Sequence, residues 1–423
     1  MNASTTDWRT ASGFSDLIAV HGRVAGWALL ASAFALSVWS PIALPMMAFA
    51  AVALLLQHRT ALRFRRPAPT SFAFWAMVFY ALHLVGMAWT ADTAFGLFDL
   101  EIKAPLLVFP LLLCFLPVEV RVGRKGVLFA MAIGGAASVL LKVLLAVVRI
   151  ASGTGLSPQQ EVFSSAFSTP AHPSYLALYL CVAIAAWVLT DAHKALSRAV
   201  GLSVFALLCL GVVLCASKAG WLVLLFLLPT LLALRWKDTA VRNALGLLLV
   251  ASLGAGGMLV AFSSFARERV VEVWQAVTES EHATTADTSS KVRWVTWAAA
   301  WELFKEQPLL GTGTGDIKDE LLHYYDVHGA THALELKLNA HQQFLQSAAC
   351  LGLLGLAAVV CMFVLPIAIA VQRRDALGWI VPVILVGNFM VESMLEVQAG
   401  VLFTVFIGTL LPWTGTATDL RRA

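Results

Sequence analysis

A histidine, an asparagine and a glutamine stand close together at the start of the stretch "NAHQQFLQSAACLGLLGL", Asn339–Leu356. Asn339 followed by Gln342 resembles a capping box, which predicts that His341 lies in the first turn of a helix. The positive end of a helix attracts anions and favours a neutral imidazole, which can accept a proton. The pattern therefore indicates either a general base beside an anionic substrate or an interfacial histidine that binds only water or the loop.

Four cations stand between or after apolar segments, where they could bind a phosphate group. Lys218 occurs in "CASKAGWLVLL" and Arg293 in "KVRWVTW", while Arg267 and Arg269 occur in "FARERV". Arginine binds phosphate through paired hydrogen bonds, so a few focused arginines can hold one phosphate group. Each cation also has a simpler interpretation. Lys218 could extend to the membrane surface, and the arginines could be solvated surface charges.

Two further polar side chains lie at the ends of apolar segments. His172 precedes Pro173 in "HPSY", and Pro173 fits the first position of a helix, so His172 is either a site residue or a neighbour of the helix cap. Glu392 and Glu396 occur in "VESMLEVQAG". Acids within membrane segments are usually functional or paired, so Glu392 is predicted to be the partner of a cation.

Other polar features have weaker chemical interpretations. The stretch "PLLGTGTGD", Pro308–Asp316, lacks the Lys-Ser/Thr ending of a nucleotide phosphate loop, and we interpret it as a glycine turn. Asp99 and Glu101 could hold a metal ion, but no other nearby residue supports such a site, so we predict no metal. His83 and Lys142 lie inside apolar segments without an assigned partner.

The composition is that of an integral membrane protein. Hydrophobic residues make up 59% of the chain, charged residues 13%, and the mean hydropathy is +0.80. A soluble domain has about 25% charged residues. The polar stretch Met1–Asp16 lacks the pattern of a secretory signal, so the first apolar segment is expected to be retained. The six cysteines lie in or beside apolar runs and are interpreted as small core residues.

The apolar segments predict an all-α polytopic fold, since about 20 apolar residues are needed to cross a bilayer as a helix. We predict about twelve transmembrane helices at 22–40, 42–57, 70–89, 104–117, 126–150, 174–190, 199–215, 219–235, 244–263, 343–371, 376–393 and 397–413.

Positive charges predict the orientation of these spans. Every even-numbered span is followed by a basic group: Arg59, Arg63, Arg65 and Arg66; Arg121, Arg124 and Lys125; Lys194 and Arg198; Arg235, Lys237 and Arg242; Arg373 and Arg374; Arg421 and Arg422. Because basic loops face the cytoplasm, these loops and both termini are predicted to be cytoplasmic.

The opposite side then holds the loop Arg149–Pro173 and a much larger loop between spans nine and ten. The larger loop contains "SSKVRWVTWAAAWELFKEQPLLG", whose apolar residues recur at helical spacing, and a looser helical segment in "DELLHYYDVHGATHALELKLNA". Its seven Lys/Arg and twelve Asp/Glu residues argue against a general polyanion-binding surface, and we predict no nucleic-acid partner. The predicted organisation is spans one to nine in 1–263, the loop in 264–342 and spans ten to twelve in 343–423.

Three of these motifs together resemble the O-antigen ligases of the O-antigen ligase and polymerase superfamily. The motifs are "SKAGW" after span seven, "RWVTW…PLLGTGTG" in the large loop, and "HQ" nine residues before "GLLG". The family signature of His-(Asn/Ser/Gln), nine residues and Gly-x-x-Gly is met by His341, Gln342, Gly352 and Gly355. Where the family has arginine, three residues and leucine, this chain has Lys218 and Leu222. Lysine keeps the charge but loses the bidentate guanidinium.

The resemblance implies glycan transfer from undecaprenyl pyrophosphate to the lipid A–core oligosaccharide, on the periplasmic face of the bacterial inner membrane. It implies His341 as general base, and we expect Arg293, in the family-like block, to be the catalytic cation. The candidates for binding pyrophosphate or glycan are Lys218, Arg269, Arg267, Gln342, His172 and Glu392. Pyrophosphate is the leaving group, so neither ATP nor another cofactor is expected, and direct attack would invert the anomeric centre. The alternatives are an O-antigen polymerase, a protein O-oligosaccharyltransferase, and a flippase or transporter of lipid-linked glycans.

Overall fold

The chain is helical in the part that the computed structural model describes, which is residues 22–38, 40–115, 124–152, 172–192, 196–262, 267–268, 270–271 and 289–410. No strand occurs in these residues, so the all-α prediction is confirmed for them. The predictions for Met1–Asp16, for Arg269 and for most of Arg149–Pro173 fall outside the described residues.

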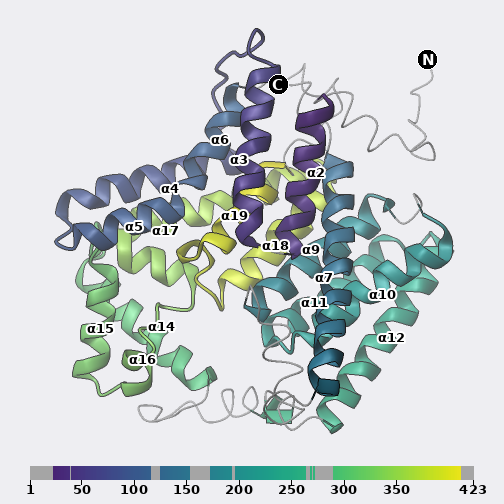
Figure 1. The fold of residues 1–423 in the computed structure, drawn as a ribbon. Coiled ribbons are helices and arrows are strands. Elements are labelled where there is room, and N and C mark those ends of the chain that lie inside the picture. Colours follow the sequence, from purple (N-terminus) through teal and green to yellow (C-terminus); the bar gives the residue numbers. More distant parts are fainter. Residues whose placement is uncertain are drawn as a thin grey trace. The chain divides into compact units, whose positions relative to one another are not determined.

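Contacts divide the described helices into two compact units. The first unit contains α2 (Arg23–Val38), α3 (Ser40–Gln57), α7 (Arg124–Ser152), α9 (Pro173–Leu189), α10 (Arg198–Leu214), α11 (Lys218–Leu234) and α12 (Thr239–Phe262). Within it α2 lies beside α3, and α9 packs against α7, α10 and α11 (Figure 1). Because α9 is apolar on all sides, it is buried without a break from Ser174 to Val188.

The second unit contains α4 (Phe72–Gly86), the 3-10 turn η1 (Met87–Trp89), α5 (Thr93–Lys103), α6 (Pro105–Phe115), α14 (Ser289–Glu306), α15 (Ile317–Val327), α16 (Thr331–Glu335), α17 (Gln343–Gln372), α18 (Ala376–Phe389), the 3-10 turn η4 (Met394–Glu396) and α19 (Gln398–Leu410). The long helix α17 is its centre, since α4, α14 and α18 all pack on it (Figure 1).

A helix occupies each of the twelve predicted segments, with ends that differ by a few residues. Four helices in the described residues are long and apolar enough to cross a membrane by length and composition: Phe72–Trp89, Lys125–Arg149, Thr239–Phe262 and Gln343–Gln372. The others are shorter, and the number of twelve spans stays a prediction.

The large predicted loop is partly helical, as its sequence indicates, because α14, α15 and α16 all lie within it. The predicted division into 1–263, 264–342 and 343–423 concerns membrane topology. Contacts group the helices in a different way, since the three loop helices belong to the same unit as α4–α6 and α17–α19. Residues far apart in the sequence therefore meet in the second unit.

The glycine stretch Pro308–Asp316 fits into a break in α17. The break lies at Gly352, whose φ of 62° and ψ of −154° are accessible almost only to glycine. Three backbone hydrogen bonds satisfy the groups that the break leaves without helical partners: Thr312 N to Ala349 O (2.9 Å), Gly313 N to Cys350 O (3.0 Å) and Leu353 N to Pro308 O (2.8 Å). The interpretation as a glycine turn is confirmed, and the backbone conformation at position 352 explains why a glycine stands there.

The same stretch also fixes the ends of two neighbouring helices. The hydroxyl of Thr314 donates to the carbonyl oxygen of His83 at 2.7 Å, near the end of α4. The carboxylate of Asp316 accepts hydrogen bonds from the backbone N–H groups of Ala91 (2.8 Å) and Asp92 (2.7 Å), immediately before α5. The glycine turn thus connects α4, α5 and α17.

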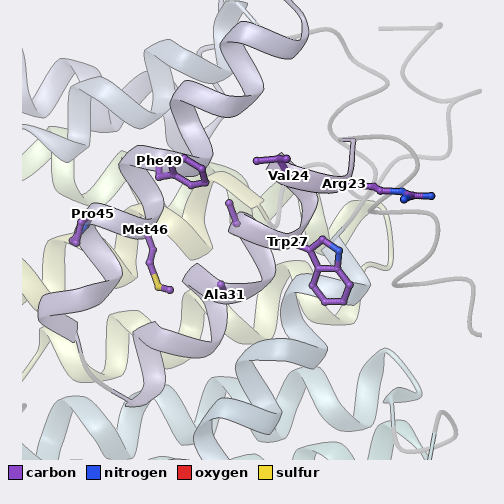
Figure 2. A pocket seen from close by; sticks show the side chains of 8 residues that line it. Arg23, Val24, Trp27, Ala31, Pro45, Met46 and Phe49 are labelled. Atoms are coloured by element: carbon purple, nitrogen blue, oxygen red, sulfur yellow. The ribbon is translucent and has the colours of Figure 1, made fainter.

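A cavity of about 630 Å³ lies between α2 and α3 in the first unit (Figure 2). Apart from Arg23, its lining is apolar: Val24, Trp27, Ala28, Ala31, Pro45, Met46 and Phe49. The lining contains no histidine and no carboxylate, so this cavity has no side chain that could take a proton from a sugar hydroxyl.

Candidate functional site

His341 lies just before α17 rather than in its first turn, because the N-cap is three residues later than the predicted one at Asn339. The helix begins at Gln343, and the N-cap is Gln342, which the sequence suggested as the far member of a capping box. Asn339 explains the shift because its side-chain oxygen accepts from the N–H of His341 at 2.9 Å and forms a tight turn there. His341 has a φ of 47°, a conformation that costs a non-glycine residue roughly 1–3 kcal/mol and that often occurs at functional sites.

One face of α14 holds the segment that carries His341. The hydroxyl of Thr296 donates to the carbonyl oxygen of Ala340 at 3.2 Å, and the indole N–H of Trp297 donates to the carbonyl oxygen of His341 at 3.4 Å. Arg293 lies one helical turn before these two residues and therefore on the same face. Helix α14 thus fixes the backbone at His341 and places a guanidinium group beside it.

Glu392 joins Arg293 to His341. Its Oε1 accepts from Nη2 of Arg293 at 3.0 Å, and its Oε2 lies 3.3 Å from Nδ1 of His341. The side chain of Glu392 is 8% exposed, whereas those of Arg293 and His341 are 24% and 28% exposed. The carboxylate is therefore mostly withdrawn from water, while the two side chains that it holds remain accessible to a substrate.

This arrangement suits proton transfer to Nε2 of His341, the ring nitrogen that does not face Glu392. A carboxylate accepts hydrogen bonds, so it favours the tautomer in which Nδ1 of His341 carries the proton. The other nitrogen, Nε2, then has a free lone pair and makes no hydrogen bond with the described residues. Arg293 has further N–H donors besides the one that contacts Glu392. The trio can thus accept a proton and bind an anion at neighbouring positions.

Gln342 makes structural contacts through its side-chain oxygen and its backbone N–H group. Its side-chain oxygen accepts from the N–H of Leu345 and caps α17, and its own backbone N–H donates to the hydroxyl of Ser393 at 3.1 Å. Gln342 is 8% exposed. The amide next to His341 therefore sets where the helix begins and connects it to the segment that carries Glu392.

The remaining candidates within the described residues are Lys218, His172 and Arg267. Lys218 begins α11, and His172 is the N-cap of α9, where its Nδ1 accepts from the N–H of Ser174 at 3.4 Å; both belong to the first unit. Arg267 is exposed. Of the eight predicted site residues, the structure brings together His341, Arg293, Glu392 and Gln342.

Sequence reasoning missed Thr296, Trp297 and Ser393, which hold the backbone of the site. Thr296 and Trp297 follow Arg293 by three and four residues, so helical spacing could have assigned them to its face. Ser393 acts through the backbone of Gln342, and no pattern in the sequence indicates that contact.

The comparison with known proteins concerns the central part of the chain. Residues 203–360 match the family model described as O-antigen ligase. No curated protein matches the chain. The matched range includes Lys218, Arg293, His341 and Gln342, whereas His172 and Glu392 lie outside it.

Proposed function

We propose that this chain, whose residues 203–360 match the O-antigen ligase family model, belongs to the O-antigen ligase and polymerase superfamily and transfers O-antigen polysaccharide from undecaprenyl pyrophosphate to the lipid A–core oligosaccharide. The family implies lipid-linked polysaccharide substrates, and the apolar helices indicate a multi-pass membrane protein. A ligase needs one group that deprotonates the acceptor hydroxyl and one that stabilises the departing pyrophosphate.

The observation that carries the proposal is the contact of one carboxylate with both a histidine and an arginine. Glu392 orients His341 so that Nε2 faces away from the carboxylate, and it holds Arg293 nearby. These three residues come from the large loop and from the ends of two spans. Only the fold of the second unit brings them together.

In the proposed step, Nε2 of His341 takes the proton of an acceptor hydroxyl while that oxygen attacks the anomeric carbon of the donor. The new glycosidic bond forms as the bond between the anomeric carbon and the phosphate oxygen breaks, and the pyrophosphate leaves with the electron pair. The imidazolium then releases its proton to water. Direct attack inverts the anomeric centre.

Arg293 is proposed to bind the pyrophosphate. Phosphoryl oxygens gain negative charge as the glycosidic bond breaks, and a fixed guanidinium stabilises that charge without rearranging. The salt bridge to Glu392 keeps Arg293 in place between reactions. Because pyrophosphate is already a good leaving group, the reaction requires neither ATP nor a metal ion.

We propose that the site faces the periplasm of the bacterial inner membrane and that both termini are cytoplasmic. The supporting observation is the alternation of basic loops along the sequence, which favours an outside location for the large loop with Arg293 and His341. The carrier-linked glycan is then available on the same side as the acceptor.

Reconstitution tests the assignment of the acceptor. Protein in liposomes receives purified carrier-linked glycan and one of three acceptors: lipid A–core, a second carrier-linked glycan, or an acceptor protein, without nucleotide or added metal. The proposal requires transfer to lipid A–core, and His341→Gln serves as the matched inactive control. Transfer only to the second glycan would identify a polymerase, and transfer only to the protein would identify an oligosaccharyltransferase. Movement of the glycan across the membrane without any transfer would identify a flippase.

A further inference from the structure

A second, mostly buried charged cluster belongs to the second unit. Lys103, at the end of α5, is 0% exposed and forms ion pairs with Asp99 and with Glu396, the latter at 2.8 Å. His83 lies nearby, with Nε2 3.9 Å from Oδ2 of Asp99. Burial alone would lower the pKa of the Lys103 ammonium, but the two carboxylates raise it above its ordinary value, so Lys103 stays charged.

Such a cluster is not explained by stability alone. Withdrawing each ion from water costs on the order of several kcal/mol, and apolar side chains of similar volume often stabilise a core equally well. Buried ions do, however, restrict which arrangement of the surrounding segments can form, because a mispaired charge is strongly unfavourable. The question is which segment the ions of this cluster hold in place.

The segment that they hold is Glu392–Glu396. At one end, Glu392 contacts Arg293 and His341. At the other end, Glu396 contacts Lys103 and also accepts from Nε2 of Gln343 at 3.3 Å.

The start of α17 reinforces this attachment. Oε1 of Gln343 accepts from the N–H of Leu395 at 2.7 Å, and the hydroxyl of Ser393 accepts from the N–H of Gln342. Displacing Glu396 would therefore disturb the segment and the helix start that follows His341.

We propose that the Lys103–Glu396 ion pair positions Glu392 for the transfer reaction and that Lys103 and Glu396 are positioning residues. This inference rests on the proposed function, because it assigns to Glu392 the orientation of His341. Both residues lie outside the part of the chain that matches the family model. Neither one contacts the reacting groups directly, so their effect must pass through the segment Glu392–Glu396.

The principal variant is Glu396→Gln, with Asp99→Asn as its matched control. Each removes one carboxylate charge from the surroundings of Lys103 and leaves the other to pair with it, but only Glu396 belongs to the segment that carries Glu392. Glu396→Gln should lower kcat about tenfold or more, since a displacement of about 1 Å can reduce a rate on the order of 10²-fold. Asp99→Asn should change kcat no more than about twofold. Neither should alter KM for the carrier-linked donor.

A double-mutant cycle on kcat tests whether the two residues act as a pair. If Lys103→Met and Glu396→Gln act through one contact, the double variant loses no more than the more damaging single variant. If the fold-loss in kcat of the double variant equals the product of the two single fold-losses, the proposal is overturned, because the residues would then act independently.

A measurement without turnover separates this inference from the proposed function. The rate at which diethyl pyrocarbonate modifies His341 at pH 8, measured by mass spectrometry, reports how firmly the imidazole is held. We expect His341 to react at least about threefold faster in Glu396→Gln than in Asp99→Asn. Equal reactivity and equal kcat in these two variants would refute the positioning role even if His341→Gln abolishes transfer. Full transfer by His341→Gln would refute the proposed function, whatever the modification rates.

Discussion

Glu392→Gln is the substitution that most clearly separates the charge of the carboxylate from its shape. Glu392 uses one oxygen for Arg293 at 3.0 Å and the other for His341 at 3.3 Å. A glutamine amide offers one acceptor and one donor, so it cannot accept from both partners. If the amide oxygen keeps Arg293, the amide N–H faces Nδ1 of His341 and favours the tautomer with the proton on Nε2. That nitrogen can then no longer act as a base.

The expected loss follows from the contribution of general-base catalysis, which is on the order of 10²–10⁴ in rate. Single-turnover transfer to lipid A–core in liposomes, with donor binding measured in parallel, should show a loss of about 10² or more and little change in donor affinity. Glu302→Gln is the control, since Glu302 is a half-exposed carboxylate on α14 whose ion pair within the described part of the chain is with Lys305. Transfer by Glu392→Gln at the wild-type rate would refute the role of the carboxylate.

Three other predictions concern the anion site, the helix break and the topology. Arg293→Ala should reduce single-turnover transfer about 10²-fold or more, by loss of one fixed cation, while the amount of folded protein in the membrane stays constant; unchanged transfer would remove Arg293 from the site. Gly352→Ala should destabilise the protein by at least about 1–3 kcal/mol in thermal unfolding, because the φ of Gly352 is positive and an added Cβ would lie 2.3 Å from the Leu309 oxygen. The control Gly246→Ala should not destabilise it, because Gly246 has open space around it. Equal melting temperatures for the two variants would contradict this account of the break. Cysteine introduced at position 287 should react with an impermeant thiol reagent in cells with a permeabilised outer membrane, and cysteine at position 65 should not; the reverse labelling pattern would invert the topology.

The helices were predictable because their apolar segments are long and their loops are clearly polar. The break in α17 was not, because "LGLLG" reads as continuous apolar helix and its disruption depends on a distant glycine turn. The sequence indicated Gly352 only through the family signature. Its positive φ and the close approach of the Leu309 carbonyl group explain why glycine is needed at this position in this chain.

Sequence motifs indicated the residues that are proposed to carry the chemistry, but not the residues that hold them in place. His341 and Arg293 belong to recognisable motifs, and the expectation that Glu392 partners a cation agrees with its salt bridge to Arg293. The sequence does not show which cation pairs with Glu392, because its partner Arg293 is 99 positions away along the chain. The position of His341 was misjudged because Asn339 binds the backbone N–H of His341 itself and delays the start of the helix.

The sequence also does not show the environment of Lys103. Asp99 and Lys103 have the spacing of an ion pair on one helical turn, which the sequence shows. Their burial and their contact with Glu396 arise only when α5 and η4 pack together. The spacing of Asp99 and Lys103 alone therefore reveals neither the burial of this ion pair nor its connection to Glu396.

The rate of a single turnover by His341→Gln tests the central claim most directly. A glutamine amide can still form hydrogen bonds with a substrate but cannot take its proton. With carrier-linked glycan and lipid A–core in reconstituted membranes, and with the chemical step shown to limit the rate, transfer should fall on the order of 10²–10⁴-fold while binding of the carrier lipid is retained. Transfer at the wild-type rate under these conditions would show that His341 is not the base.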